Sequence, residues 1–357
     1  MGNAEPRTNK LGNVLMRFIP LFSLIIPFAI LYYLDPKSFE VTWKGRTFYL
    51  FFLWIVTLEV IVNWEKISKT KLTKKASIRT IVFVAVLLVP TLYVIAANYY
   101  GLNTAMMDFA RMSSVWRDAI WCVPLSIEYL VFTILFALLV FLEYGIEGLS
   151  NSAISVFFLG VIGLIYTTDT LYPYGRFTPF QFLVPATSML AAMMLGMMGY
   201  IPKLTYTEKH PIYGSITNLA LVDPLGKPIR DPLNNPIILS IAWPCSGIDS
   251  LLIYSVTIML FLKNSDMHLW QKIVLFTVGA VVTYFINALR IVSIYLIAIN
   301  YGVGTTQFWE FHNFYGQLYS ITWIVCYPLI IVGIQILSNW LKSKRKSKQG
   351  NPPEPIS

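Results

Sequence analysis

Cys245 is the residue best placed for covalent chemistry. It lies in the sequence Trp-Pro-Cys-Ser-Gly-Ile-Asp, directly before the apolar run 248–262 and therefore at a predicted membrane boundary. A thiolate at such a position can act as a nucleophile. Cys122 and Cys326 instead fall inside apolar runs, where a free cysteine usually behaves as a small buried hydrophobic residue. The sequence therefore predicts Cys245 as the nucleophile.

The residues after Cys245 indicate how a helix presents the thiol. Ser246 and Asp249 have the spacing of a capping box, with Ser246 as the N-cap residue of the helix that becomes the span. Cys245 would then face the positive end of this helix, which lowers the pKa of a cysteine thiol. The negative charge of Asp249 opposes that effect.

Arg290 is a cation inside an otherwise apolar helix. Such residues are costly in a membrane and usually face a bundle interior or an aqueous cavity. If the helix begins on the cytoplasmic side near Lys272, its rise of 1.5 Å per residue places Arg290 about 27 Å across, close to the depth of Cys245. The alternative is an arginine that extends toward the outer headgroups. Asn287, three residues earlier on the same face, favours a site.

His312 lies in a short polar connection before the last apolar run. A histidine can be neutral or charged near physiological pH, so it could activate the thiol and then protonate a leaving amine. The sequence contains no HExxH, no paired CxxC and no phosphate-binding glycine loop. We therefore expect no metal and no cofactor.

The composition of the chain predicts that it is a membrane protein. Hydrophobic residues make up 56% of the chain and charged residues only 13%, whereas about a quarter of a soluble protein is charged. The net charge of +9 comes largely from basic clusters at 66–79 and 342–348, beside apolar runs. Such clusters are typical of cytoplasmic anchors in membrane proteins, so we expect no nucleic-acid partner. The first apolar run lacks a small-residue cleavage site, which argues against a cleavable signal peptide.

The apolar runs predict an all-α polytopic membrane protein of about eight or nine transmembrane helices. Each run is long enough to cross a bilayer of about 30 Å. The candidate spans are residues 14–34, 47–63, 80–98, 119–142, 154–171, 181–201, 248–262, 273–298 and 318–338.

Charge in the connections predicts the orientation of the second half. The basic tail places the C-terminus in the cytoplasm, and the connection 299–317, which contains no Lys or Arg, then lies outside with the loop 202–247. The first half disagrees, because a cytoplasmic 64–79 loop followed by four crossings returns the chain to the inside. One candidate must be re-entrant or interfacial, or one crossing is hidden. The stretches Tyr99–Asp118 and Tyr172–Arg176 are the places we expect it.

We divide the chain into N-terminal membrane helices (1–178), a catalytic membrane core (179–338) and a basic cytoplasmic tail (339–357). The core contains the extracytoplasmic loop 202–247, in which Asp-Pro-Leu-x-x-Pro occurs twice, from Asp223 and from Asp231. Both copies predict turns, because Asp binds its own backbone and Pro fixes φ. With a β-like run at 216–222, the loop is either a small cap of strand and turns or a simple connector.

Three motifs in order resemble the exosortase and archaeosortase family of membrane cysteine transpeptidases. They are Cys-Ser-Gly-Ile at Cys245–Ile248, Asn-x-x-Arg at Asn287–Arg290 and His-x-x-x-Gly at His312–Gly316. The run from Pro179 to Pro202 also resembles the helix that precedes the β segment in that family. The similarity covers about residues 179–338, while residues 1–178 are similar only as generic membrane helices.

The resemblance implies a role for each motif residue. Cys245 would be the nucleophile, Arg290 a cation for the thiolate or the oxyanion, and His312 the third catalytic residue. Some archaeal members have Arg at the third position, so general-base and electrostatic roles for His312 both stay open. The supporting residues would be Ser246, Gly247, Asn287 and Gly316.

The resemblance also implies the partners. The substrate would be a secreted protein with a C-terminal Pro-containing motif, a transmembrane helix and a basic tail, and a lipid or other surface acceptor would receive it. This chain's own Pro353-Glu354-Pro355 follows its basic cluster and precedes no span, so we interpret it as a disordered tail.

A transporter is the alternative. Glu59, Glu128 and Asp169 fall within or beside apolar runs, where carboxylates can mark ion routes, and Arg290 would then bind an anionic substrate. We find no clear inverted repeat between the halves, although many transporters have one. The sequence favours the transpeptidase.

Overall fold

The computed structural model describes residues 18–41, 44–64, 78–112, 120–171, 183–210, 214–263, 265 and 267–349. The chain forms two compact units. The first contains Met1–Ser188, Leu204–Leu219 and Leu239–Ser246, and the second contains Met189–Lys203, Ala220–Ile238 and Gly247–Ser357. The Tyr172–Arg176 break, the basic residues at 65–77 and the Pro353–Pro355 segment lie outside the described residues.

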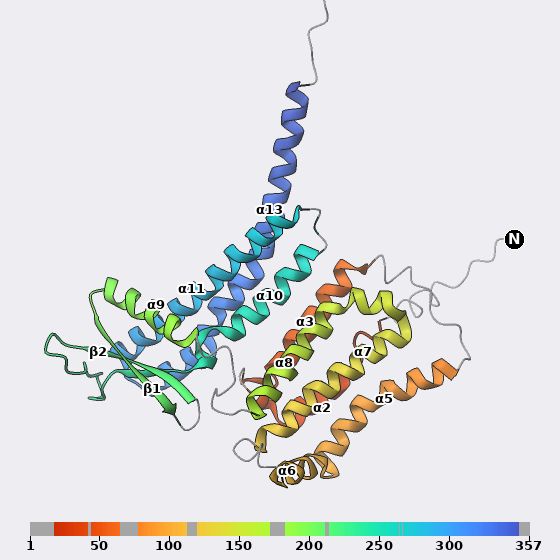
Figure 1. The fold of residues 1–357 in the computed structure, drawn as a ribbon, viewed down its shortest axis with the longest axis horizontal. Coiled ribbons are helices and arrows are strands. Elements are labelled where there is room, and N and C mark those ends of the chain that lie inside the picture. Colours follow the sequence, from red (N-terminus) through yellow and green to blue (C-terminus); the bar gives the residue numbers. More distant parts are fainter. Residues whose placement is uncertain are drawn as a thin grey trace, which may run out of the picture. The chain divides into compact units, whose positions relative to one another are not determined.

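The first unit is a bundle of helices (Figure 1). Its helices are α2 (Ile25–Leu34), α3 (Thr47–Val62), α5 (Ile78–Tyr99), α6 (Leu102–Met112), α7 (Val123–Asn151) and α8 (Ala153–Leu171). α7 and α8 pack closely because small residues lie between them. A Cβ atom at Gly163 would come within 2.8 Å of Leu130 Cδ2. Adjacent antiparallel helices of this kind follow from the short connection at Ser152.

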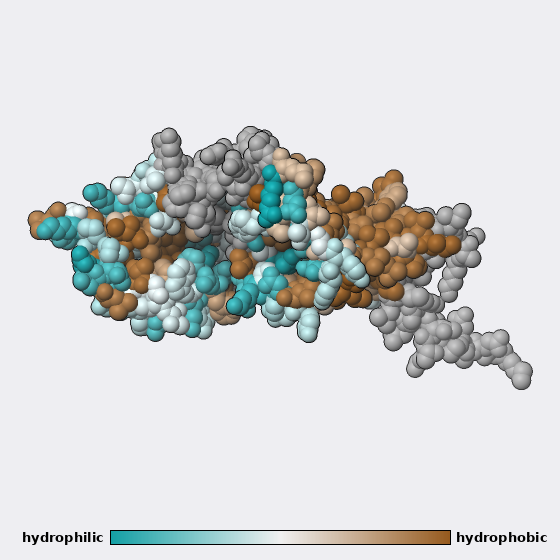
Figure 2. All heavy atoms as spheres, turned by 90° about the horizontal axis from the view of Figure 1, so that it is seen from below, coloured by the Kyte–Doolittle hydropathy of each residue, from teal (hydrophilic) through white to brown (hydrophobic). Residues whose placement is uncertain are grey.

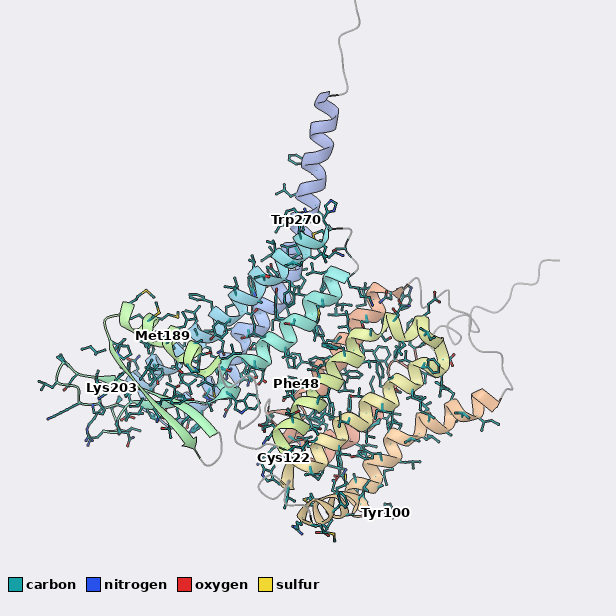
Figure 3. The ribbon with its side chains drawn as sticks, viewed as in Figure 1. Phe48, Tyr100, Cys122, Met189, Lys203 and Trp270 are labelled. Carbon is teal, nitrogen blue, oxygen red and sulfur yellow. The ribbon has the colours of Figure 1, made fainter. Side chains whose placement is uncertain are left out.

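Aromatic side chains fill the core of the first unit. The Tyr49 ring stacks between Phe28 and Tyr129, with centroid distances of 4.2 Å and 4.3 Å. Phe48, labelled in Figure 3, packs edge-on against Phe158 and Tyr166. All six side chains are buried, and this aromatic packing holds the helices together.

Several buried charged groups of the first unit have close polar contacts. The Arg46 guanidinium donates to both Glu128 oxygens, at 2.8 Å from Nε and 3.0 Å from Nη2. Lys44 Nζ lies 2.7 Å from Asp169 Oδ2. The Glu59 carboxylate accepts the Ile154 main-chain N–H at 3.0 Å. The three carboxylates of the transporter alternative therefore all have structural contacts.

The second unit contains a three-helix bundle of α10 (Ile248–Lys263), α11 (Leu269–Tyr301) and α13 (Gly316–Gln349). The Tyr254 hydroxyl of α10 donates to the Phe276 carbonyl at 2.8 Å, and the Tyr327 hydroxyl of α13 donates to the Leu275 carbonyl at 2.7 Å. Both contacts lie in the first half of α11, toward the end that connects to α10. At the other end of α11, the helix α12 (Thr306–Glu310) and a π-helical segment (Phe311–Tyr315) lead into α13.

A helix and a small sheet precede Cys245. α9 (Leu183–Met197) is followed by a turn at Gly199, whose φ of +90° favours glycine, and then by β1 (Ile201–His210). The sheet continues with β2 (Gly214–Val222) and β3 (Ile238–Ile241) in the order β1-β2-β3. The predicted β-run is confirmed by β2. We did not predict β1, and the candidate span 181–201 is four residues shorter at its end than expected.

Each predicted apolar run overlaps a helix, but the expected count of eight or nine transmembrane helices is not confirmed. Within the described part of the chain, five helices are long and apolar enough to cross a membrane. They are Ile81–Tyr99, Ile120–Asn151, Ala153–Leu171, Leu269–Tyr301 and Thr306–Ile334. Three shorter apolar helices accompany them at Ile25–Leu34, Thr47–Val62 and Leu183–Met197.

The outer surface of these helices is apolar. Ile81 is 73% exposed, Ile134 66% and Leu164 59%. Figure 2 shows hydrophobic residues covering much of the visible helical surface, while the strand-and-turn segment is more hydrophilic. A water-soluble protein seldom exposes apolar patches of this extent, so the surface fits a multi-pass membrane protein.

Candidate active site

Cys245 lies in a single 3-10 turn, Trp243–Ser246, between β3 and α10. Its main-chain N–H donates to the Ala242 carbonyl at 2.9 Å, and its side chain is partly exposed. The Ser246 hydroxyl donates to the Trp243 carbonyl at 2.6 Å. The Thr187 hydroxyl of α9 reaches the Ser246 carbonyl at 3.3 Å. These contacts fix the backbone on both sides of the thiol, and sequence reasoning missed the contribution of Thr187.

The predicted N-cap residue of α10 is wrong, because the cap is Gly247 and not Ser246. α10 begins at Ile248, and the Leu251 N–H donates to the carbonyl of Gly247 at 3.0 Å. Gly247 is therefore the N-cap residue, and its φ of +88° is a conformation that favours glycine. Ser246 instead closes the 3-10 turn. The thiol still belongs to the residue two positions before the helix cap.

Gly247 is also required by the space around it. A Cβ atom there would lie 2.9 Å from both Cγ and Nδ2 of Asn287. Asn287 is only 1% exposed, so its amide cannot move aside into solvent. The start of α10 therefore packs directly on α11, one helical turn before Arg290.

Arg290 is held against the segment that carries His312. Its Nη2 atom donates to the His312 carbonyl at 2.8 Å. A Cβ atom at Gly316 would lie 2.9 Å from Arg290 Nε, so glycine leaves the room that the guanidinium occupies. Two of the three predicted catalytic residues are thus in contact, and the predicted supporting glycine lies at that contact.

His312 lies on a π-helical segment and not in the polar connection that we predicted. Its Nδ1 atom is 3.1 Å from Asn313 Oδ1. The ring stacks on Phe308 with a centroid distance of 6.3 Å and meets Trp309 edge-on at 5.7 Å. A π-helical turn inserts an extra residue into a helix and occurs frequently at functional sites.

The predicted site residues are distributed over both units. Gly247, Asn287, Arg290, His312 and Gly316 belong to the second unit, where the contacts above join them. Cys245 and Ser246 end the last segment of the first unit and are joined to Gly247 through the peptide chain.

The two Asp-Pro-Leu-x-x-Pro copies form the predicted turns. Asp223 Oδ1 accepts the N–H groups of Leu225 and Lys227 at 2.9 Å and 2.8 Å. Asp231 Oδ1 accepts those of Leu233 and Asn235 at 2.9 Å and 2.7 Å. Both segments fold back in the same way because the side chain of each Asp closes its own turn.

Asp231 has one further contact, which sequence reasoning missed. Its Oδ2 atom accepts the Val303 N–H at 2.7 Å, across the turn between α11 and α12. Burial opposes the charge of this carboxylate, but the N–H groups of Val303, Asn235 and Leu233 outweigh it and lower the pKa of Asp231 below its ordinary value.

Among the described residues, no group of three His, Cys, Asp or Glu side chains could hold a metal ion. A comparison with protein families gives a clear match. The family described as transmembrane exosortase matches residues 43–331.

The chain belongs to the transmembrane exosortase family. The match contains all three motifs and begins at residue 43, so the family similarity also covers residues 43–178, which we expected to be similar only as generic membrane helices. Membership suggests a membrane transpeptidase. No curated protein and no solved structure shows significant similarity to this exosortase.

Proposed function

We propose that this exosortase is a membrane cysteine transpeptidase that cleaves the C-terminal sorting signals of secreted proteins. The observation that carries the proposal is the hydrogen bond from Arg290 to the His312 main chain, at 2.8 Å. It joins two motifs that are 22 residues apart in the chain. An arginine that served only as a headgroup anchor would not require glycine at position 316, where any side chain would collide with the guanidinium.

Chain connectivity supports Cys245 as the third member. Gly247 contacts Asn287, and Cα atoms of consecutive residues are about 3.8 Å apart, so the Cys245 Cα lies within roughly 8 Å of the Gly247 Cα. Asn287 and Arg290 occupy the same face of α11 because they are three residues apart. We therefore assign Cys245, which is two residues before Gly247 in the chain, to the same site.

The proposed reaction begins when His312 accepts the thiol proton of Cys245. The thiolate attacks the scissile carbonyl carbon, and the guanidinium of Arg290 stabilises the oxyanion that forms. The intermediate collapses with loss of the amine of the sorting signal, which takes the proton from His312, and a thioester remains on Cys245. An amine or hydroxyl group of the acceptor then attacks the thioester and transfers its proton to His312, and the Cys245 thiolate that leaves takes this proton back to regenerate the thiol.

We place this site on the extracytoplasmic side with both termini in the cytoplasm. This arrangement needs one apolar helix that does not cross, and α9 fits best. Its fifth residue, Thr187, binds the carbonyl of Ser246, two residues before α10 begins, and its end leads directly into β1. α6 does not provide the missing crossing, because it has only 11 residues and carries an exposed Asp108–Arg111 pair. Eight crossings then place the basic 64–79 loop in the cytoplasm.

The proposed substrate is a secreted protein that ends in a Pro-containing motif, one transmembrane helix and a basic tail. The acceptor is a lipid or another surface molecule. Both follow from the family resemblance. The hydrophilic surface of the strand-and-turn segment supports them, because this segment delivers the chain to Cys245 on the proposed outer side.

The test is processing of such a substrate, taken from the same genome and co-expressed in membranes. Cys245→Ala should abolish cleavage while membrane insertion stays normal, because only this thiol forms the thioester. Cys122→Ala and Cys326→Ala should cleave normally. Equal cleavage by Cys245→Ala and the parent protein would refute the proposal.

The orientation is tested with a membrane-impermeant thiol reagent on intact cells. In a background of Cys122→Ala and Cys326→Ala, the reagent should modify Cys245. Gly226→Cys, in the exposed turn, serves as the access control. Glu147→Cys, near the α7–α8 connection, should react only after permeabilisation. Labelling of Glu147→Cys in intact cells would show that α9 crosses the membrane.

A further inference from the structure

The repeated turn provides an internal comparison. Both copies have the sequence Asp-Pro-Leu-x-x-Pro, and in both the Oδ1 atom of Asp accepts main-chain N–H groups two and four residues later. Asp223 is partly exposed, whereas Asp231 is 5% exposed. Both aspartates therefore make the same hydrogen bonds within their own turns. A different effect of replacing them must come from contacts with residues outside the turn.

Among the described contacts, the second copy meets the turn at the end of α11, and the first copy does not. Asp231 Oδ2 accepts the Val303 N–H at 2.7 Å. A Cβ atom at Gly302 would lie 2.9 Å from Leu233 Cδ1 and 3.3 Å from Asp231 Oδ2. The turn at Asp231 therefore packs so closely on Gly302 that a side chain there would collide with it. Gly302 has a φ of +103°, which favours glycine for a second reason. Backbone shape and the carboxylate therefore fix the α11–α12 turn together.

The turn fixed by Asp231 is the starting point of the segment that carries His312. The Thr305 hydroxyl donates to the Gly302 carbonyl at 3.0 Å and accepts the Phe308 N–H at 3.3 Å. Phe308 is buried, and its ring stacks on the His312 ring. A continuous series of contacts thus runs from the loop carboxylate through Thr305 and Phe308 to the imidazole.

We propose that Asp231 is a positioning residue for His312, acting through the Val303 N–H and α12. The inference rests on the proposed function, because it assigns Asp231 to the same site. It adds a role for the strand-and-turn segment. That segment leads to Cys245 in the chain, and its second turn also fixes the backbone before the segment that carries His312.

The sharpest test compares Asp231→Asn with Asp223→Asn. In both variants the amide oxygen can still accept the two N–H groups of its own turn. At position 231, however, the –NH2 group then faces the Val303 N–H, so two donors meet where a charge-assisted hydrogen bond was. Val303→Pro breaks the same bond from the other side, because proline has no N–H. It is the second variant if Asp231→Asn does not fold.

The first measurement is amide hydrogen exchange of the purified full-length protein in detergent micelles. Asp231→Asn should accelerate exchange over residues 303–312 by roughly tenfold or more, the factor that corresponds to loss of a hydrogen bond to a charged group. Asp223→Asn should leave this segment unchanged. Equal exchange in the two variants would overturn the inference.

The second measurement is the pH profile of Cys245 alkylation in the Cys122→Ala and Cys326→Ala background. His312→Ala should shift the midpoint of the profile, and Asp231→Asn should shift it in the same direction, whereas Asp223→Asn should not. A shift with His312→Ala but none with Asp231→Asn would overturn the positioning role and leave the proposed function intact. No shift with His312→Ala would instead contradict the catalytic assignment, while hydrogen exchange still decides whether Asp231 holds the segment.

Discussion

The two units treat charge in opposite ways. In the first unit, Arg46 meets Glu128 through two hydrogen bonds and Lys44 meets Asp169, so opposite charges lie side by side among apolar helices. In the second unit, the described hydrogen bond of Arg290 goes to a main-chain carbonyl, which has no net charge. The residue that supplies this carbonyl is His312.

We use this difference to distinguish a structural role for Arg46 from the proposed catalytic role of Arg290. A buried ion pair satisfies both partners and holds two helices together, but it leaves little positive potential for a ligand. The Arg290 guanidinium is positioned by the His312 carbonyl and by the space that Gly316 leaves beside it. The second arrangement suits a group that must stabilise an anion formed only during a reaction.

The largest expected effect comes from replacing the two arginines in parallel. Arg290→Ala should lower substrate processing by on the order of 10²–10³-fold, as for removal of an oxyanion donor, while the protein stays folded. Arg290→Lys should lose most of the activity as well, because lysine lacks the planar fork. The measurement is the initial rate of substrate cleavage in membranes, with thermal unfolding in detergent as the parallel assay.

Arg46→Ala should have the opposite signature. It leaves Glu128, whose side chain is 2% exposed, without its cation, and breaking such a pair costs about 3–5 kcal/mol of stability. Protein that remains folded should process substrate normally. Normal processing by Arg290→Ala, or loss of activity without loss of stability in Arg46→Ala, would reverse our assignment of the two charges.

Elements of the fold could be predicted from the sequence where the signal was local. Apolar length identified the helices, and the spacing of Asp and Pro identified both turns, because each turn is closed by its own side chain. The order of the motifs predicted that Arg290 and His312 belong to one site; in the structure, Arg290 Nη2 donates to the His312 main-chain carbonyl, while the catalytic roles stay predictions.

The errors arose where distant contacts decide local shape. Ser246 has the sequence context of an N-cap residue. The N-cap is instead the next residue, Gly247, because Asn287 leaves no room there for a side chain. The polar residues around His312 are typical of a loop, yet they form a π-helical segment in contact with Arg290. Asp231 could not be distinguished from Asp223, since its additional partner is 72 residues away.

A smaller effect is expected at the glycines that line helix contacts. Gly316→Ala would place a methyl group 2.9 Å from Arg290 Nε and 2.9 Å from the Phe311 carbonyl, so the guanidinium has to move. Displacements of this size can reduce catalysis by up to about 10²-fold, and we expect roughly tenfold slower processing. Cleavage rates measured beside those of the parent protein provide the test.

Gly160→Ala is the matched control in the first unit. Its Cβ atom would meet only the Thr133 Cγ2 methyl, at 3.2 Å, and small shifts of that side chain can accommodate it. Processing by Gly160→Ala should therefore equal that of the parent protein. If Gly316→Ala is equally active, the glycine is not needed to shape the Arg290 site, and the contrast between the units weakens.

The smallest effect is expected at Glu59, a buried carboxylate of the first unit. Its carboxylate accepts the Ile154 and Ser155 N–H groups at 3.0 Å and 3.3 Å, at the start of α8. It therefore caps that helix from α3, where a negative charge also interacts favourably with the helix dipole. Glu59→Gln keeps one accepting oxygen and loses the charge, so it should lower stability by about 1–2 kcal/mol and leave processing unchanged. A lower unfolding midpoint with unaltered cleavage would extend the structural role to every carboxylate of the transporter alternative, whereas a loss of transfer activity without destabilisation would return Glu59 to that alternative.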